Sequence, residues 1–131
     1  MDIFNVLAAA SASFVFGAIW YMVLSDSWMT ASGVARDADG KPLNSSNPRP
    51  CILSAISAIV VAGMMRHVLA ASGVTAISLG VIAVFGIGAF LIVPWMMMNN
   101  EVAGKPFQLT IIDGGYAVIG CTLMGAVLMA F

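Results

Sequence analysis

The segment "LTIIDGGYAVIGCTLMGAVLMAF", residues 109–131, contains a single charged side chain, Asp113. A helix that crosses the apolar core of a bilayer needs about 20 consecutive, mainly apolar residues. The segment therefore predicts a transmembrane helix. It also raises the question of why a carboxylate lies inside it.

Three further segments of the chain meet the same criterion, at residues 3–24, 51–71 and 74–98. The first and third are uncharged, and the second carries Arg66 and His67 near its end. The opening "MDIFN" lacks the basic region of a signal peptide, so we expect the first segment to remain as a membrane helix. The pattern predicts an all-α integral membrane protein, with four transmembrane helices in a small bundle that forms one membrane domain over residues 1–131.

The composition of the 131 residues agrees with this class. Hydrophobic residues make up 61% and charged residues 8%, against roughly 45–50% and 25% in an ordinary soluble domain. So few charges cannot cover the surface of a soluble fold, and we expect the lipid bilayer to surround the chain. Five Lys and Arg with a net charge of −1 offer no basic face for a nucleic acid.

The connections between the four helices differ in length. Residues 25–50 form a long polar stretch with three of the five prolines. Its first part, "SDSWMTASGVA", predicts a short interfacial helix anchored by Trp28, and its second part predicts turns. The link near residues 72–73 predicts a tight antiparallel hairpin of the second and third helices, and residues 99–108 predict a medium loop. Pro94 predicts a kink, because its ring clashes with the carbonyl four residues earlier.

Basic residues are distributed unevenly between the two faces of this bundle. Four helices place both termini on one face, where Arg66 is the basic residue. The two longer connections share the other face and carry Arg36, Lys41, Arg49 and Lys105. Because cytoplasmic loops are enriched in Lys and Arg, we expect a multi-pass protein of the bacterial inner (cytoplasmic) membrane with both termini outside.

Small residues four apart recur in three of the helices. Such ladders let helix backbones approach closely in lipid. The ladders are Ala9, Ser13 and Gly17, then Ser54, Ala58 and Ala62, and finally Ala117, Cys121 and Gly125. We expect them to be packing faces, either within the chain or against another protein.

Asp113 lies about 6 Å inside its end of the membrane at 1.5 Å of rise per residue, whereas Arg66 lies about 22 Å along its own helix from that side. The two therefore lie near opposite faces and should not pair. We expect Asp113 to accept a hydrogen bond from Tyr21, Trp20 or a backbone amide, with Gly114 and Gly115 letting a neighbouring helix or a ligand approach.

Two groups of polar and aromatic residues follow from this depth argument. The candidate site at the predicted cytoplasmic end contains Asp113, Tyr21, Trp20, Trp95 and Tyr116. A second cluster near the opposite end contains Asn5, Arg66 and His67. A purely structural hydrogen-bonding role for Asp113 and a role in handling protons or cations both remain open.

The sequence shows no motif typical of a metal site, a redox site or a catalytic site. Cys51 and Cys121 form no zinc or redox motif, and the consecutive residues Met96, Met97 and Met98 point to three sides of a helix, so they cannot share one copper ion. We expect no metal and no cofactor. No spacing typical of a nucleophile with its base occurs, which predicts a non-enzymatic protein.

Three stretches carry a family resemblance: "FVFGAIWYMVLSDSWM" (residues 14–29), "PWMMMNNEVAGKPFQLTIIDGGY" (94–116) and "LMGAVLMAF" (123–131). They resemble an uncharacterised bacterial membrane family catalogued as domain of unknown function 1761. The most recognisable positions are Gly17, Trp20, Tyr21, the Trp28–Met29 pair, and Asp113-Gly-Gly-Tyr116. The resemblance implies a four-helix membrane protein and implies no activity.

Three functions remain as hypotheses. The small size, the packing ladders and the lack of catalytic groups favour an accessory or assembly subunit of a larger inner-membrane complex of respiratory or photosynthetic type. The alternative is a small, oligomeric, proton-linked transporter or carrier that uses Asp113. An enzyme acting on lipid ranks last. A stoichiometric partner subunit would indicate the first hypothesis, and a homo-oligomer with a polar cavity would indicate the second.

Overall fold

The computed structural model describes residues 3–43 and 45–131, and these residues are almost entirely helical. The elements are α1 (Ile3–Val23), α2 (Ser25–Ser32), α3 (Arg49–Ala71), α4 (Ile77–Ile87), the π-helical turn η1 (Gly88–Ile92), α5 (Val93–Val102) and α6 (Phe107–Ala130). Because α4, η1 and α5 run on as one helix, four helices are long and apolar enough to cross a membrane. The chain is a multi-pass, all-α membrane protein, as the sequence predicts.

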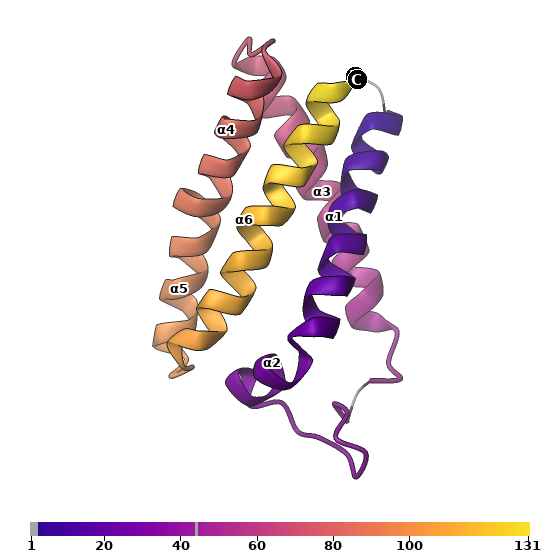
Figure 1. Cartoon of the computed structure of the whole chain (residues 1–131), viewed down its shortest axis with the longest axis vertical. Coiled ribbons are helices and arrows are strands. Elements are labelled where there is room, and N and C mark those ends of the chain that lie inside the picture. The colour runs from indigo at the N-terminus through magenta and orange to yellow at the C-terminus, as the bar shows by residue number, and fades with distance from the viewer. Residues whose placement is uncertain (1–2, 44) are drawn as a thin grey trace.

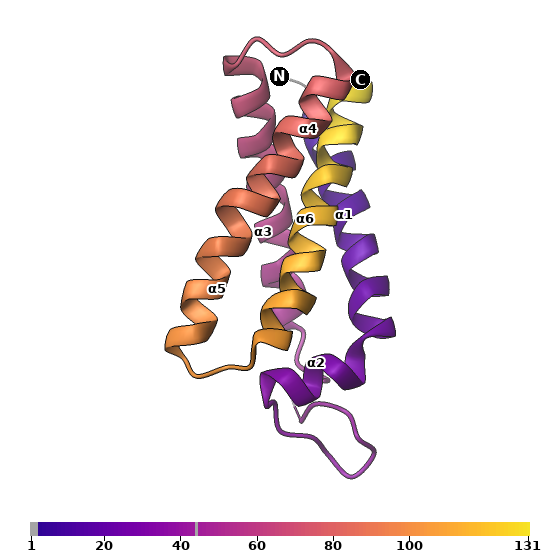
Figure 2. The ribbon, with the colours of Figure 1, turned by 60° about the vertical axis from the view of Figure 1, so that its left-hand side comes forward.

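Helix α6 is the centre of the bundle. It packs against α1 on one side and against α4, η1 and α5 on the other, while α3 packs mainly against α1 (Figures 1 and 2). Helix α1 begins and α6 ends at one end of the molecule. The opposite end carries α2 and the link between α5 and α6, and is called the α2 end below.

Each of the three small-residue ladders has members at contacts between helices of the chain. A Cβ atom on Gly17 would lie 2.6 Å from Cζ of Tyr116, so α1 and α6 could not keep their present separation with a larger residue there. Gly125 of α6 receives the side chain of Val84 from α4 in the same way. Ala9 and Ala62, on the facing surfaces of α1 and α3, are completely buried. Close backbone approach is the expected driving force for helix association in lipid.

The predicted tight hairpin of the second and third helices is wrong. The link from α3 to α4 is short, with Gly73 in the left-handed conformation at φ 67°, but α3 does not pack along α4. The reason lies in which partner each helix contacts. Ala58 and Ala62 of α3 are buried on the side of α1, whereas Gly80 and Val84 of α4 contact α6. The two helices therefore diverge from their shared link (Figure 1).

Two predicted connections are shorter than expected. Helix α5 continues through Asn99 and Asn100 to Val102, so the predicted loop at 99–108 is reduced to residues 103–106. The Asn100 side-chain amide donates to Oγ1 of Thr110 at 3.1 Å. This hydrogen bond joins α5 to α6 across the link. Helix α3 begins two residues earlier than predicted, with Pro50 in its first turn, where the missing N–H of proline is not needed.

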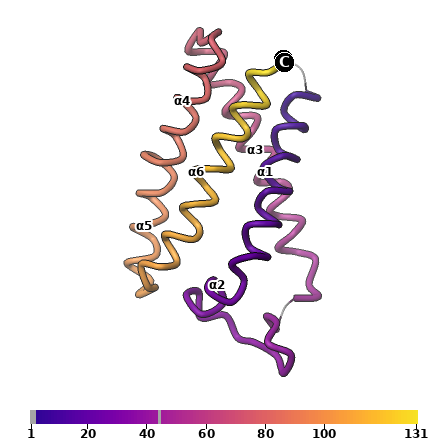
Figure 3. The backbone as a smooth tube through the Cα atoms, in the orientation of Figure 1, coloured from indigo at the N-terminus to yellow at the C-terminus, as the bar shows by residue number. Residues whose placement is uncertain are grey.

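Pro94 lies directly after an irregular turn. The N–H of Val93 donates to the carbonyl of Gly88, five residues earlier, and Gly88–Ile92 is π-helical. A wider turn of this kind is one of the known ways in which a helix departs from regular α winding. The irregularity expected from Pro94 therefore takes the form of a π turn just before it, and the helix continues (Figure 3).

The polar stretch after α1 starts with the expected short helix, α2. It ends at Gly33, which has a φ of 72°, and the Lys105 ammonium donates to the carbonyl of Ser32 at 2.7 Å. A cation at the C-terminus of a helix satisfies carbonyls that have no partner in the helix. The following segment forms turns, in which Oδ1 of Asp37 accepts from the backbone N–H groups of Asp39 and Lys41.

Candidate functional site

The divergence of α3 from α4 and α5 leaves a cleft of about 860 Å³ towards the α2 end. One wall is α3, with Leu53, Ser54 and Ser57. The opposite wall is the end of η1 and α5, with Ile92 and Met96, and α6 contributes residues from Asp113 to Met124. Most of the lining is apolar, and its polar groups are a few hydroxyl groups, the Trp28 indole and one carboxylate.

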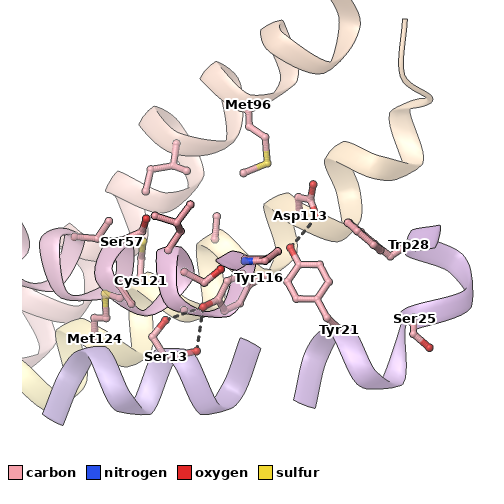
Figure 4. A pocket seen from close by; sticks show the side chains of 18 of the residues that line it. Ser13, Tyr21, Ser25, Trp28, Ser57, Met96, Asp113, Tyr116, Cys121 and Met124 are labelled. Carbon is pink, nitrogen blue, oxygen red and sulfur yellow. Dashed lines mark hydrogen bonds between the residues drawn. The ribbon is translucent and has the colours of Figure 1, made fainter. Parts of the chain in front are cut away.

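Asp113 is the carboxylate in this cleft, and it is half-buried. The phenol of Tyr21 donates a hydrogen bond of 2.7 Å to its Oδ1 atom, and the indole of Trp28 lies beside it (Figure 4). The expected hydrogen bond from Tyr21 is therefore present. Tyr21 lies near the end of α1 and Asp113 in the second turn of α6, so antiparallel packing of these helices brings both to one level.

The two glycines after Asp113 let neighbouring side chains reach α6. The Trp20 ring lies on Gly115, where a Cβ would come within 2.7 Å of its Cζ2 atom, and Val93 lies on Gly114. The Trp20 Nε1–H group donates to the carbonyl of Ile112 at 2.9 Å. Trp20 thus contacts the backbone beside the carboxylate and fixes α1 against α6 at the height where Tyr21 meets Asp113.

Tyr116 extends the site towards the middle of the bundle. Its hydroxyl donates to the backbone carbonyl of Ser13 at 3.1 Å, and its ring covers Gly17 and Gly120. The Tyr21 ring is almost perpendicular to its neighbours, with an angle of 76° and a centroid distance of 5.5 Å to Tyr116, and 81° and 6.1 Å to Trp28. Tyr21, Trp28, Tyr116 and Asp113 form what we call the aromatic–carboxylate site.

The charge of Asp113 has no cationic partner in the part of the chain that the structure describes. Among residues 3–43 and 45–131, no Lys, Arg or His lines the cleft. The ion pair of this part of the chain joins Arg36 to Asp26 at 3.7 Å, on the exposed surface of the α2 end. A carboxylate within a membrane span is costly unless it is paired, hydrogen-bonded or protonated. The arrangement can therefore hold a proton or a cation at Asp113.

Other residues predicted for these sites are not brought together. The Trp95 side chain is 67% exposed and lies outside the cleft, whereas the next residue, Met96, lines it. In the second cluster Asn5 is buried and His67 is exposed, and no hydrogen bond or ion pair joins them or Arg66 within the described residues.

Sequence reasoning missed several residues that line the cleft. Trp28 was expected to be an interfacial anchor, and Met96 was considered as a copper ligand that its neighbours could not join. Both side chains face the cleft (Figure 4). Ser57 of α3 was not singled out. Its place depends on the direction in which α3 leans, and the sequence of α3, apolar on all sides, does not indicate that direction.

No curated protein and no solved structure matches the chain. A sequence model of the family described as "Protein of unknown function (DUF1761)" matches residues 4–129. This range contains α1 except its first residue, all residues that line the cleft and the whole aromatic–carboxylate site. The match covers almost the full length, and the chain therefore belongs to this family of proteins of unknown function.

Proposed function

We propose that the protein is a non-enzymatic carrier of the inner membrane, which binds a small amphipathic molecule in the cleft and exchanges it for a proton at Asp113. The observation that carries this proposal is the cleft itself, an apolar cavity with one carboxylate that no cationic side chain of the described residues balances. Its volume of about 860 Å³ lies within the range of roughly 300–1,000 Å³ typical of small-molecule sites.

The distribution of polar groups suits an amphipathic ligand. Asp113, Tyr21 and Trp28 lie near the α2 end, whereas Val61 and Met124 lie deeper in the cleft and are apolar. A ligand would thus place a polar head at the carboxylate and an apolar body towards the middle of the membrane. Since α3 does not pack along α5, we propose that the ligand enters from the lipid between these two helices.

The basic residues support one orientation. Arg36, Lys41, Arg49 and Lys105 belong to the α2 end, and Lys and Arg are enriched on the cytoplasmic side of membrane proteins. We propose that the α2 end, with the aromatic–carboxylate site, faces the cytoplasm. Because one chain offers a single carboxylate in its cleft, we further propose that two or more copies associate to form the complete carrier.

Occupancy of the cleft can be tested by cysteine protection. Ser57 lines the cleft, and its neighbour Ile56 is on the same helix at the same depth but is outside the cleft and 52% exposed. In a chain with Cys51→Ser and Cys121→Ser, an amphipathic compound should slow alkylation of Ser57→Cys by N-ethylmaleimide and leave Ile56→Cys unaffected. Equal rates with and without a broad panel of amphipathic compounds would refute binding in the cleft.

A second proposal, an accessory or assembly subunit of a respiratory or photosynthetic complex, has its own supporting observation. Ser54 and Ser57 are exposed on the α3 side of the cleft, and small residues allow a transmembrane helix of another subunit to come close. On this proposal a partner should purify with the chain in mild detergent at a fixed ratio, and Ser57→Leu should release it. Purification as a homo-oligomer alone would argue against this role.

A further inference from the structure

Resting on the carrier proposal, we propose that the molecule held in the cleft is a lipophilic organic cation, bound with its positive centre at the aromatic–carboxylate site. The charge of the cleft favours a cation. Asp113 is the acidic residue lining the cleft, and the described residues place no Lys, Arg or His there. A cationic head supplies the counter-charge that the cleft lacks, whereas an anionic head would bring like charge to a site of low polarity.

The aromatic rings around the carboxylate also favour a cation. Cations bind to the faces of Trp and Tyr rings within about 6 Å of the ring centroid, and clusters of such rings recognise ammonium groups that have no hydrogen to donate. Tyr21, Trp28 and Tyr116 all line the cleft next to Asp113. The Tyr21 ring is nearly perpendicular to both neighbours, so the three rings do not form one stack.

The remainder of the cleft is apolar and suits the lipophilic part of such a ligand. Leu53, Val61, Ile92, Met96 and Met124 line it beyond the polar end. Methionine side chains are flexible and adapt to differently shaped partners. The site therefore specifies the charge of the ligand at one end and tolerates a range of bulky apolar groups in the rest.

Protons and cations would compete for the same carboxylate. The other titratable groups that line the cleft are the phenols of Tyr21 and Tyr116 and the thiol of Cys121. On α2, Asp26 is exposed to solvent and pairs with Arg36, and the cleft-lining residues of α3, η1 and α5 are uncharged. When a cation binds to protonated Asp113, the carboxyl proton leaves to the solvent, so the net charge of the site stays the same. Cation binding should weaken as the pH falls.

The test uses three tetraphenyl compounds of nearly the same shape: the tetraphenylphosphonium cation, neutral tetraphenylmethane and the tetraphenylborate anion. The full chain carrying Ser57→Cys, with both native cysteines replaced by Ser, is placed in nanodiscs of zwitterionic lipid. Protection of this cysteine from N-ethylmaleimide is measured against the membrane concentration of each compound, determined by dialysis. The cation should protect at a concentration about tenfold lower than the neutral compound, a ratio that marks a specific charge contribution.

Two carboxylate variants in this background locate the charge preference. Asp113→Asn should remove the advantage of the cation and leave protection by the neutral compound unchanged, whereas Asp26→Asn should change neither. Unchanged protection by tetraphenylmethane also shows that the Asp113→Asn chain still forms the cleft. In weakly buffered solution at mildly acidic pH, binding of the cation should release protons from the chain that retains Asp113 and none from the Asp113→Asn variant.

The outcomes separate this inference from the carrier proposal. If all three compounds protect Ser57→Cys equally, the cleft binds ligands but not by charge, and the cation inference is overturned alone. A cation preference that survives Asp113→Asn overturns it as well. If none of the three, nor the broader panel of amphipathic compounds, protects the cysteine, the carrier proposal falls and the cation inference falls with it.

Discussion

Removing one member of the Tyr21–Asp113 hydrogen bond should cost more than removing both. Asp113→Leu leaves the Tyr21 hydroxyl, now bonded at 2.7 Å, without its acceptor beside the rings of Trp28 and Tyr116. A buried polar group that loses its partner costs about 1–3 kcal/mol, and replacing both partners by apolar groups is nearly neutral. Tyr21→Phe should destabilise by a similar amount, because it removes the donor from a carboxylate.

A double-mutant cycle measures this coupling. The free energy of unfolding is obtained in mixed micelles from the loss of helical circular dichroism as the fraction of dodecyl sulfate rises. Tyr21→Phe combined with Asp113→Leu should lose less stability than either single variant, because neither polar group is then left without its partner. The coupling energy should therefore exceed the loss of one single variant, about 1–3 kcal/mol. Asp113→Asn should be tolerated, because its amide oxygen still accepts the hydrogen bond.

The control is Asp26, an aspartate whose side chain is 92% exposed. Asp26→Leu should change the free energy of unfolding by no more than about 0.5 kcal/mol, as is usual for exposed positions. If the losses for Tyr21→Phe and Asp113→Leu add up in the double variant, the two side chains do not stabilise each other, and the hydrogen bond is not what holds this end of α1 on α6.

Three further predictions concern packing and orientation. Gly125→Ala should destabilise by about 1–3 kcal/mol, the usual cost of overpacking, because its methyl group meets Val84. Gly86→Ala should not destabilise, because the space around Gly86 is open. Equal losses for the two variants in the same unfolding assay would contradict this prediction. Gly17→Leu should displace Tyr116 and lower the yield of folded protein, so an unchanged yield and elution volume would show that this contact is dispensable. A cysteine replacing Ser46 should resist a membrane-impermeant thiol reagent added to intact cells, and labelling there would reverse the proposed orientation.

The depth of each side chain in the membrane could be predicted from the sequence. The side of the helix that faces the bundle could not. Counting residues from the ends of the spans placed Tyr21 and Asp113 at one level and Arg66 far from both. The structure agrees, because Tyr21 bonds to Asp113 and Arg66 lies in the last two turns of α3, away from the α2 end. In a soluble helix the polar side shows which face is inside. Lipid is as apolar as a protein core, so helices such as α3 are apolar all round and carry no such label.

The small-residue ladders supplied part of the missing direction. Gly17 and Gly125 identified the faces on which α1 and α4 meet α6. The ladder on α3 was less informative, because Ala62 packs against α1 while Ser54 remains exposed in the cleft. A ladder thus indicates a face on which another helix can approach. Where the described chain supplies no helix at a position of the ladder, a cleft can form.

The π turn Gly88–Ile92 decides which side chain of α5 faces the carboxylate. Val84 contacts α6 twelve positions before Met96, and at about 100° per residue a regular α-helix would place these two roughly 120° apart. The wider turn absorbs about one residue, which brings Met96 to within roughly 20° of Val84 and turns Trp95 outward. In regular α winding the stripe that continues from Val84 and Gly88 would reach Trp95 instead. The π turn thus determines which side chain lies beside Asp113. It places the flexible thioether of Met96 there, where regular α winding would place the indole of Trp95.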